Sequence, residues 1–311
     1  MKRVILSMLA LIFLVPVAIG CQTNGKNQPD QAEDTLKVYT SIYPLYDFAK
    51  QVGGTKVQVE NIVPPGAEPH DWEPSPQDMV KMTKANVIIL SGTGVEHWGD
   101  KILNTLDREN ITIIQAGQRL NLIEETHAHT DSPEHHLHDP HVWLDPLHAK
   151  IMVDEILTGL VKADPNNKSY YQANANQFQQ ELDKLHLEYQ ENLAKTKTKE
   201  FITSHAAFGY LAKRYGLIEI PIRGLAAESE PSPADMAAII ELARNKNIDT
   251  IFFETLVNPK VSETLASELK AKTLVLNPIE GLSEQELASG ENYLSVMRKN
   301  LANLKIALGA E

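Results

Sequence analysis

Three histidines and one glutamate stand at the ends of expected strands or in the loops beside them. His70 lies in a loop after an apolar run, His205 follows one directly, His141 lies in an Asp-Pro-His-Val-Trp-Leu-Asp-Pro stretch, and Glu280 closes an Asn-Pro-Ile-Glu stretch. Open α/β sheets collect ligands at the carboxyl ends of their strands. Three imidazoles and one carboxylate suit zinc, which binds histidine nitrogen at about 2.0–2.1 Å. The four residues are therefore candidate ligands of one zinc site.

A second group of histidines has a different setting. Five of them fall within twelve residues, among Glu, Thr, Asp, Ser and Pro: His127, His129, His135, His136 and His138. Such a polar tract predicts a loop, 127–138, that binds metal loosely. The alternative is a solvated loop whose histidines have no role in binding.

The first residues have the pattern of an export signal. Lys2 and Arg3 precede an apolar run at 5–19, which is short for a transmembrane helix. The sequence Ala-Ile-Gly-Cys ending at Cys21, the single cysteine of the chain, resembles a bacterial lipobox. We therefore expect 1–20 to be a signal peptide and Cys21 to be lipidated. The alternative is a plain signal peptide with an unused cysteine.

Residues 21–35 are polar and predict a flexible tether, because they cannot bury a core. The formal net charge of the chain is -12. Nucleic-acid binding needs clustered Lys and Arg, so we expect no nucleic-acid partner.

From residue 36 onward, short apolar strands alternate with helical segments, which predicts parallel sheets covered by helices. The pattern occurs twice, at 36–163 and at 197–311. Glu-Pro-Ser-Pro at 73–76 returns at 230–233, each followed two residues later by Asp-Met. Each copy predicts a serine N-cap, a proline at the first helical position and an aspartate in the first turn. A common helix-start signature is the alternative, but the order of the other segments favours two similar lobes.

Residues 164–196 contain no glycine, and their single proline stands at the start. Apolar residues recur at every third or fourth position, which predicts one face of a helix: Tyr171, Ala175, Phe178, Leu182, Leu185, Tyr189 and Leu193. About 30 residues at 1.5 Å each span roughly 45 Å. We expect one long, rigid helix that joins the lobes, and we disfavour a coiled-coil dimer because clean heptads are lacking.

The chain resembles the metal-binding lipoproteins that serve as substrate-binding receptors of bacterial ABC transporters, in the zinc-uptake branch. Its most specific matching segments are 69–75, 139–146, 203–208, 230–233 and 276–280. The resemblance implies an α/β fold of two Rossmann-like lobes joined by a long helix. It also implies a cleft metal held by residues matching His70, His141, His205 and Glu280.

The resemblance further implies a function. An extracytoplasmic monomer, anchored to the cell membrane through Cys21, would capture Zn²⁺ and deliver it to a permease coupled to a cytoplasmic ATPase. Some relatives of this branch carry an additional C-terminal metal-binding domain, and we expect none after Glu311. Four protein ligands leave no position for a reacting water, so we expect no catalysis.

Three other functions are compatible with parts of the sequence. Manganese-binding relatives carry a second carboxylate where this chain has His205, and imidazole suits zinc better than the harder manganese, so zinc is favoured. A surface adhesin with a structural zinc would leave no motif of its own. A metalloenzyme with Glu280 as general base is not supported, because the chain has no His-Glu-x-x-His segment.

Overall fold

The computed structural model describes residues 35–107, 109–124, 138–225, 227 and 231–310. Residues 34–311 form one compact unit. The expected signal peptide, the lipidation site Cys21 and nearly all of the expected tether lie outside the described residues. So do four of the five loop histidines, namely His127, His129, His135 and His136. Among the described helices, none has the length and hydropathy needed to cross a bilayer.

The N-terminal lobe is built on a four-stranded parallel sheet in the order β2-β1-β3-β4. Its strands are β1 (Leu36–Thr40), β2 (Val57–Asn61), β3 (Val87–Leu90) and β4 (Thr112–Gln115). The helices of this lobe are α1 (Tyr43–Gly53), α2 (Pro76–Met82), α3 (Gly99–Leu103) and α4 (Pro146–Ala163). Every residue of β3 is buried, as expected for a central strand covered on both faces.

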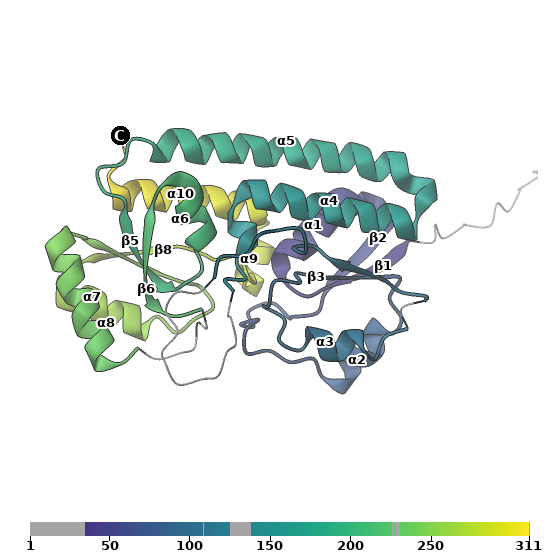
Figure 1. The fold of residues 1–311 in the computed structure, drawn as a ribbon, viewed down its shortest axis with the longest axis horizontal. Helices are drawn as coiled ribbons and strands as arrows, with labels where there is room; N and C mark the ends of the chain where they lie inside the picture. The colour runs from purple at the N-terminus through teal and green to yellow at the C-terminus, as the bar shows by residue number, and fades with distance from the viewer. Residues whose placement is uncertain (1–34, 108, 125–137, 226, 228–230, 311) are drawn as a thin grey trace, which may run out of the picture. The chain divides into compact units, whose positions relative to one another are not determined.

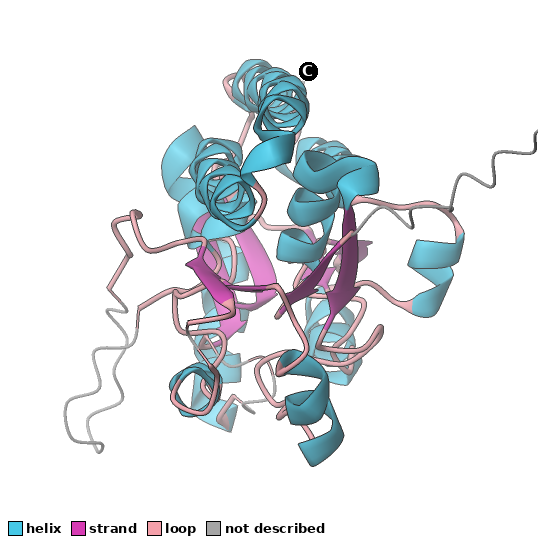
Figure 2. Ribbon diagram, turned by 90° about the vertical axis from the view of Figure 1, so that its right-hand side faces the viewer, coloured by secondary structure: helices cyan, strands magenta, loops and turns pink. Residues whose placement is uncertain are grey.

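The C-terminal lobe repeats this topology, with a parallel sheet in the order β6-β5-β7-β8. Its strands are β5 (Glu200–His205), β6 (Ile218–Arg223), β7 (Thr250–Phe253) and β8 (Lys272–Val275). Its helices are α6 (Gly209–Tyr215), α7 (Pro233–Lys246), α8 (Lys260–Leu269), α9 (Glu284–Ala288) and α10 (Tyr293–Leu308). Figure 2 shows helices on both sides of the strands. The predicted two-lobed α/β fold is confirmed.

The repeated Glu-Pro-Ser-Pro segments start equivalent helices. Ser75 caps α2 and Ser232 caps α7, each by accepting a hydrogen bond from the backbone of the aspartate three residues later. The carboxylates of Asp78 and Asp235 accept the return bond from the capping backbone, which completes a capping box in both lobes. The local prediction from the repeat is therefore confirmed in both copies.

Helix α5 (Lys168–Leu193) runs along both lobes, above α4 and α10 (Figure 1). All seven apolar positions of the predicted face are buried. The predicted segment 164–196 is longer than the helix, because Asp164 ends α4 and a 3-10 turn at Pro165–Asn167 follows it. The carboxylate of Asp164 accepts hydrogen bonds from Asn167 Nδ2 at 2.6 Å and the Tyr171 hydroxyl at 2.8 Å. It therefore stabilises the turn between the two helices rather than the start of α5.

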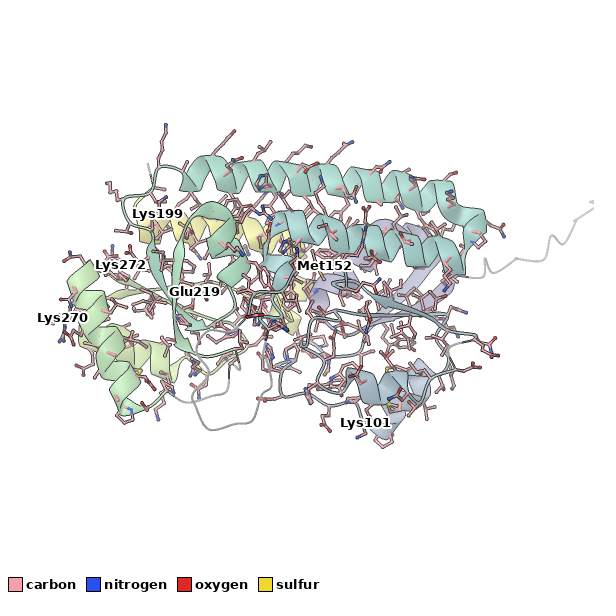
Figure 3. The ribbon with its side chains drawn as sticks, viewed as in Figure 1. Lys101, Met152, Lys199, Glu219, Lys270 and Lys272 are labelled. Atoms are coloured by element: carbon pink, nitrogen blue, oxygen red, sulfur yellow. The ribbon has the colours of Figure 1, made fainter. Side chains whose placement is uncertain are left out.

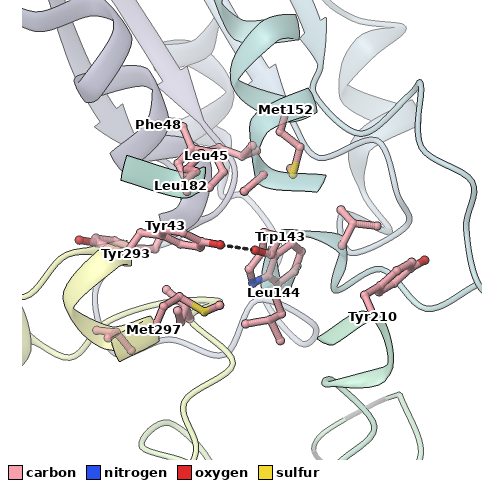
Figure 4. Close-up of a cluster of buried hydrophobic side chains, with 14 of the residues drawn as sticks. Tyr43, Leu45, Phe48, Trp143, Leu144, Met152, Leu182, Tyr210, Tyr293 and Met297 are labelled. Carbon is pink, nitrogen blue, oxygen red and sulfur yellow. Dashed lines mark hydrogen bonds between the residues drawn. The ribbon is translucent and has the colours of Figure 1, made fainter. Parts of the chain in front are cut away.

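The two lobes share a hydrophobic core around Trp143, which is fully buried (Figure 4). The indole Nε1 donates to the backbone oxygen of Pro278 at 2.7 Å. The Tyr293 hydroxyl donates to the backbone oxygen of Trp143 at 2.5 Å, and the Tyr293 ring packs edge-on against Phe48. Trp143 and Phe48 belong to the N-terminal half of the chain and Pro278 and Tyr293 to the C-terminal half, so the lobes are held by a packed core.

Replacing Trp143 with alanine is expected to lower the free energy of unfolding of the apo protein by about 3–5 kcal/mol, the usual cost of emptying a large aromatic site. Urea unfolding followed by far-UV circular dichroism measures this change. A loss below about 1 kcal/mol would mean that Trp143 does not anchor the lobes.

Candidate metal site

The structure brings together the four residues that the sequence singled out. Each of His70, His141, His205 and Glu280 offers one nitrogen or oxygen atom, and these four atoms all lie within 4.8 Å of one another. Two of the residues come from each lobe. His70 lies in the loop after β2, and His141 precedes the short 3-10 turn Val142–Leu144. His205 is the last residue of β5, and Glu280 lies in the loop after β8.

Most of the measured distances between the four atoms are close to those expected around a tetrahedral ion. The Nε2 atom of His141 lies 3.2 Å from His70 Nε2 and 3.3 Å from His205 Nε2. Oε1 of Glu280 lies 3.2, 2.7 and 3.5 Å from the Nε2 atoms of His70, His141 and His205. Ligands placed about 2.0–2.1 Å from a central zinc would be about 3.3–3.4 Å apart. Four of the five distances match this spacing closely, and only the contact between His141 and Glu280 would have to lengthen around an ion.

The site is shielded from solvent, least so at His70. The side chains of His141 and His205 are fully buried and that of Glu280 is 1% exposed, whereas the His70 side chain is 14% exposed. Charged groups at such depth are costly unless they are paired or bind metal. The charges of these four side chains must therefore be balanced within the site, either by one another or by a bound metal ion.

A carboxylate lies behind each of the two fully buried histidines. Asp139 Oδ1 lies 2.8 Å from His141 Nδ1, and it also accepts the backbone N–H of His141. Glu254 holds His205 Nδ1 with both oxygens, at 2.8 and 2.9 Å. Such contacts orient an imidazole and direct its Nε2 toward a metal. Sequence reasoning did not assign either carboxylate, although Glu254 directly follows β7 at the same sheet edge as His205 and could have been found by that rule.

Replacing Glu254 with glutamine is expected to weaken zinc binding about 10–100-fold. Loss of a carboxylate that hydrogen-bonds a ligating histidine usually lowers metal affinity by that factor. Glu241→Gln, at an exposed position of α7, is the matched control and should leave affinity unchanged. A chelator competition titration measures both variants. Equal affinities in the two would show that Glu254 does not orient His205.

The segment that carries His141 is clamped by both lobes. The hydroxyl of Tyr210 donates to the backbone oxygen of Asp139 at 2.7 Å, and that of Thr93 donates to the backbone oxygen of Pro140 at 2.9 Å. Gly209 allows α6 to approach this segment, because a Cβ there would lie 2.7 Å from Asp139 Oδ2. The pair Asp139–His141 is thus fixed in place by packing as well as by hydrogen bonds.

The turn after His205 is held by Glu219 on β6 (Figure 3). One oxygen of this carboxylate accepts from the Thr203 hydroxyl at 2.8 Å and from the backbone N–H groups of Ala207 and Phe208 at 3.2 and 3.1 Å. Burial raises the pKa of the Glu219 carboxyl to about 7. The contact fixes the chain direction immediately beyond His205.

Nearby carboxylates favour the protonated forms of His141 and His205 in the metal-free site. Burial opposes the charged form of His141, but hydrogen bonds to Asp139 and Glu280 raise its pKa to about 9. Burial likewise opposes the charge on His205, but Glu254 and then Glu280 hold its pKa well above the ordinary value. Burial alone would raise the pKa of Glu280, yet the surrounding imidazoles hold it well below its usual range. A metal ion must therefore displace protons from His141 and His205 when it binds.

A further carboxyl, Glu68, lies beside this group. Its Oε1 accepts the backbone N–H of His70 at 3.3 Å. Burial, followed by the nearby charge of Glu280, raises the pKa of Glu68 to about 9. Sequence reasoning missed Glu68, which stands two residues before His70 with no pattern of its own.

The other described histidines lie apart from the four-residue cluster. His138 forms an isolated antiparallel bridge with Glu124, at the edge of the expected histidine-rich loop. His97 is largely exposed, 3.5 Å from Glu73. His148 is partly buried, with its ring edge-on to Tyr210. Tyr210, on α6 of the C-terminal lobe, packs against the ring of His148.

Comparisons with known proteins agree with this arrangement. The family model described as ZnuA, zinc-uptake complex component A, periplasmic, matches residues 38–307. The high-affinity zinc uptake system protein ZnuA of Bacillus subtilis (strain 168) is 38% identical over 97% of both chains. The zinc-binding lipoprotein AdcA of Streptococcus pneumoniae (strain ATCC BAA-255 / R6) is also 38% identical over 98% of this chain, which spans 61% of AdcA.

Solved structures give the same result. The Zn(II)-bound ZnuA-like domain of Streptococcus pneumoniae AdcA superposes with a TM-score of 0.77 at 37% identity, over 88% of this chain and 99% of that domain. The laminin-binding protein Lmb of Streptococcus agalactiae, described as bifunctional with adhesin and metal-transporting activity, has a TM-score of 0.78 at 33% identity over 88% and 99%. With the family model covering most of its length, this chain belongs to the family of periplasmic zinc-uptake components, whose members are substrate-binding receptors.

Proposed function

We propose that this protein is an extracytoplasmic receptor that captures Zn²⁺ with His70, His141, His205 and Glu280 and delivers it for import. The observation that carries the proposal is the convergence of three Nε2 atoms and one carboxylate oxygen at tetrahedral spacing in a buried site between the lobes. Zinc is the cargo, and its four-coordinate preference matches this donor set.

The donor set favours zinc over manganese. Manganese prefers oxygen ligands and a higher coordination number, whereas imidazole suits zinc. Three of the four converging atoms are nitrogens. The set also supports capture rather than catalysis, because four protein ligands fill a tetrahedral shell and leave no place for a reacting water.

Delivery requires a membrane partner and a location outside the cytoplasm. We propose that residues 1–20 are removed as a signal peptide, that Cys21 is lipidated, and that 21–35 tether the receptor to the cell membrane as a monomer. The lipobox-like sequence before Cys21 supports the anchor. Membership of a zinc-uptake complex supports a permease with a cytoplasmic ATPase as the partner.

Zinc content and affinity test this function. Purified protein is expected to hold one tightly bound zinc per chain, measured by elemental analysis and chelator competition, and manganese at equal concentration should not displace it. A variant lacking 127–138 should retain that one tight site. Loss of tight binding in this variant would place the site in the histidine-rich loop and refute the proposed ligand set.

A further inference from the structure

The ligand Glu280 follows a residue with an unfavourable backbone conformation. Ile279 has a φ of 61° and is fully buried. A β-branched residue in the left-handed region is a genuine outlier, because its side chain crowds the backbone there. Such strain costs free energy and persists only where the surrounding structure holds it. Some part of the protein must therefore hold the chain at Ile279.

Two buried asparagines make the contacts that could do this. The amide Nδ2 of Asn300, on α10, donates to the backbone oxygen of Asn277 at 2.7 Å, and its Oδ1 accepts the backbone N–H of Asn277 at 2.9 Å. The side-chain oxygen of Asn277 in turn accepts the backbone N–H of Ile279 at 2.7 Å. Asn277 and Asn300 are 3% and 1% exposed, so water does not compete for these bonds.

The rest of the segment is fixed by the other lobe. Trp143 donates to the backbone oxygen of Pro278, and the backbone N–H of Tyr43 donates to the backbone oxygen of Glu280 at 3.2 Å. Figure 4 shows Trp143 between the lobes, facing the α10 residue Tyr293. These hydrogen bonds are all made in one conformation of the backbone at 277–280. Other conformations would leave buried backbone groups unpaired, which is costly.

We propose that Asn277 and Asn300 are positioning residues for Glu280: they hold Ile279 in its left-handed conformation so that Glu280 Oε1 reaches the three imidazoles. The amide of Asn277 is itself held, because its Nδ2 donates to Thr255 Oγ1 and to Glu286 Oε1, each at 3.1 Å. Helix α10 thus supports the metal site without touching the ion. The inference rests on the proposed function, in which Glu280 is a ligand.

The test is a double-mutant cycle on zinc affinity, measured by chelator competition. Asn300→Ala is expected to weaken zinc binding about 10–100-fold. In a Glu280→Ala background the same change should alter affinity by less than about twofold, because the ligand it positions is gone. Asn303→Ala is the matched control: it lies on the same helix and donates to the backbone oxygen of Val275 at 2.8 Å, outside the Asn277 network. It should leave affinity unchanged in both backgrounds.

A milder variant keeps the test decisive if Asn300→Ala fails to fold by circular dichroism. Thr255→Val preserves shape at an exposed position and removes an acceptor of the Asn277 amide. It should weaken zinc binding about threefold, the value of one hydrogen bond, only when Glu280 is present. Equal losses with and without Glu280, or no loss in either asparagine-network variant, would overturn the inference. Unchanged affinity in Glu280→Ala alone would instead refute the ligand set.

Discussion

Replacing His205 with alanine is expected to weaken zinc binding at least 100-fold. A four-ligand zinc site contributes about 10–16 kcal/mol, so the loss of one ligand costs roughly 3 kcal/mol or more. His205 is fully buried and fixed by Glu254, and none of the other described residues joins the ligand cluster to replace it. Calorimetric or competition titration measures the change.

His97→Ala is the matched control, because His97 is largely exposed and lies outside the cluster. It should bind zinc as tightly as the unchanged protein. The His205→Ala variant should also lose its preference for zinc over manganese, because one of three nitrogen donors is removed. Tight zinc binding that survives in His205→Ala would exclude the proposed site.

Zinc binding at pH 7 is expected to release about two protons per ion. The pKa of His141 is about 9 and that of His205 lies well above its ordinary value in the metal-free site, so both imidazoles carry a proton at pH 7. Both must lose it to bind metal. Affinity should therefore fall as the pH drops below about 9, and the fall should approach 100-fold per pH unit once both imidazoles are fully protonated in the metal-free protein. Calorimetry in buffers of different ionisation enthalpy counts the protons.

The same linkage predicts the stability of the metal-free protein. Groups whose pKa is raised by folding stabilise the folded state fully below their unfolded pKa, which is about 6.5 for histidine. That contribution is lost as pH rises through the folded pKa of about 9 for His141. Thermal unfolding of the metal-free protein should thus shift to lower temperature between pH 6.5 and 9, while zinc-loaded protein should not. In the calorimetric experiment on zinc binding, a proton release near zero would show that His141 and His205 are already deprotonated in the metal-free site.

The sequence predicted the fold and the four converging residues because both depend on local patterns. Strand and helix periodicity, repeated capping motifs and the rule that ligands gather at strand ends need no knowledge of distant neighbours. The start of α5 was misplaced by four residues, because Asp164 can cap either a helix or a turn and the choice depends on its contact with Tyr171.

The supporting residues could not be found in the same way. Glu254 is 49 residues from His205 and Asn300 is 23 from Asn277, so their contacts appear only once the sheets and α10 are assembled. Buried glutamates and asparagines look like surface residues in a sequence, because only the tertiary fold shows which polar side chains lose water. The ligands of the site can therefore be predicted from the sequence, whereas the residues that hold those ligands in place cannot.

The most direct test of the account is X-ray absorption at the zinc edge of the loaded protein, together with its Glu280→Ala variant. We expect a four-coordinate zinc with three imidazole nitrogens and one oxygen at about 2.0–2.2 Å. In Glu280→Ala the three imidazoles should remain while the carboxylate oxygen is lost or replaced by water. A six-coordinate shell dominated by oxygen, or an unchanged spectrum in a variant lacking His70, His141 and His205, would contradict it.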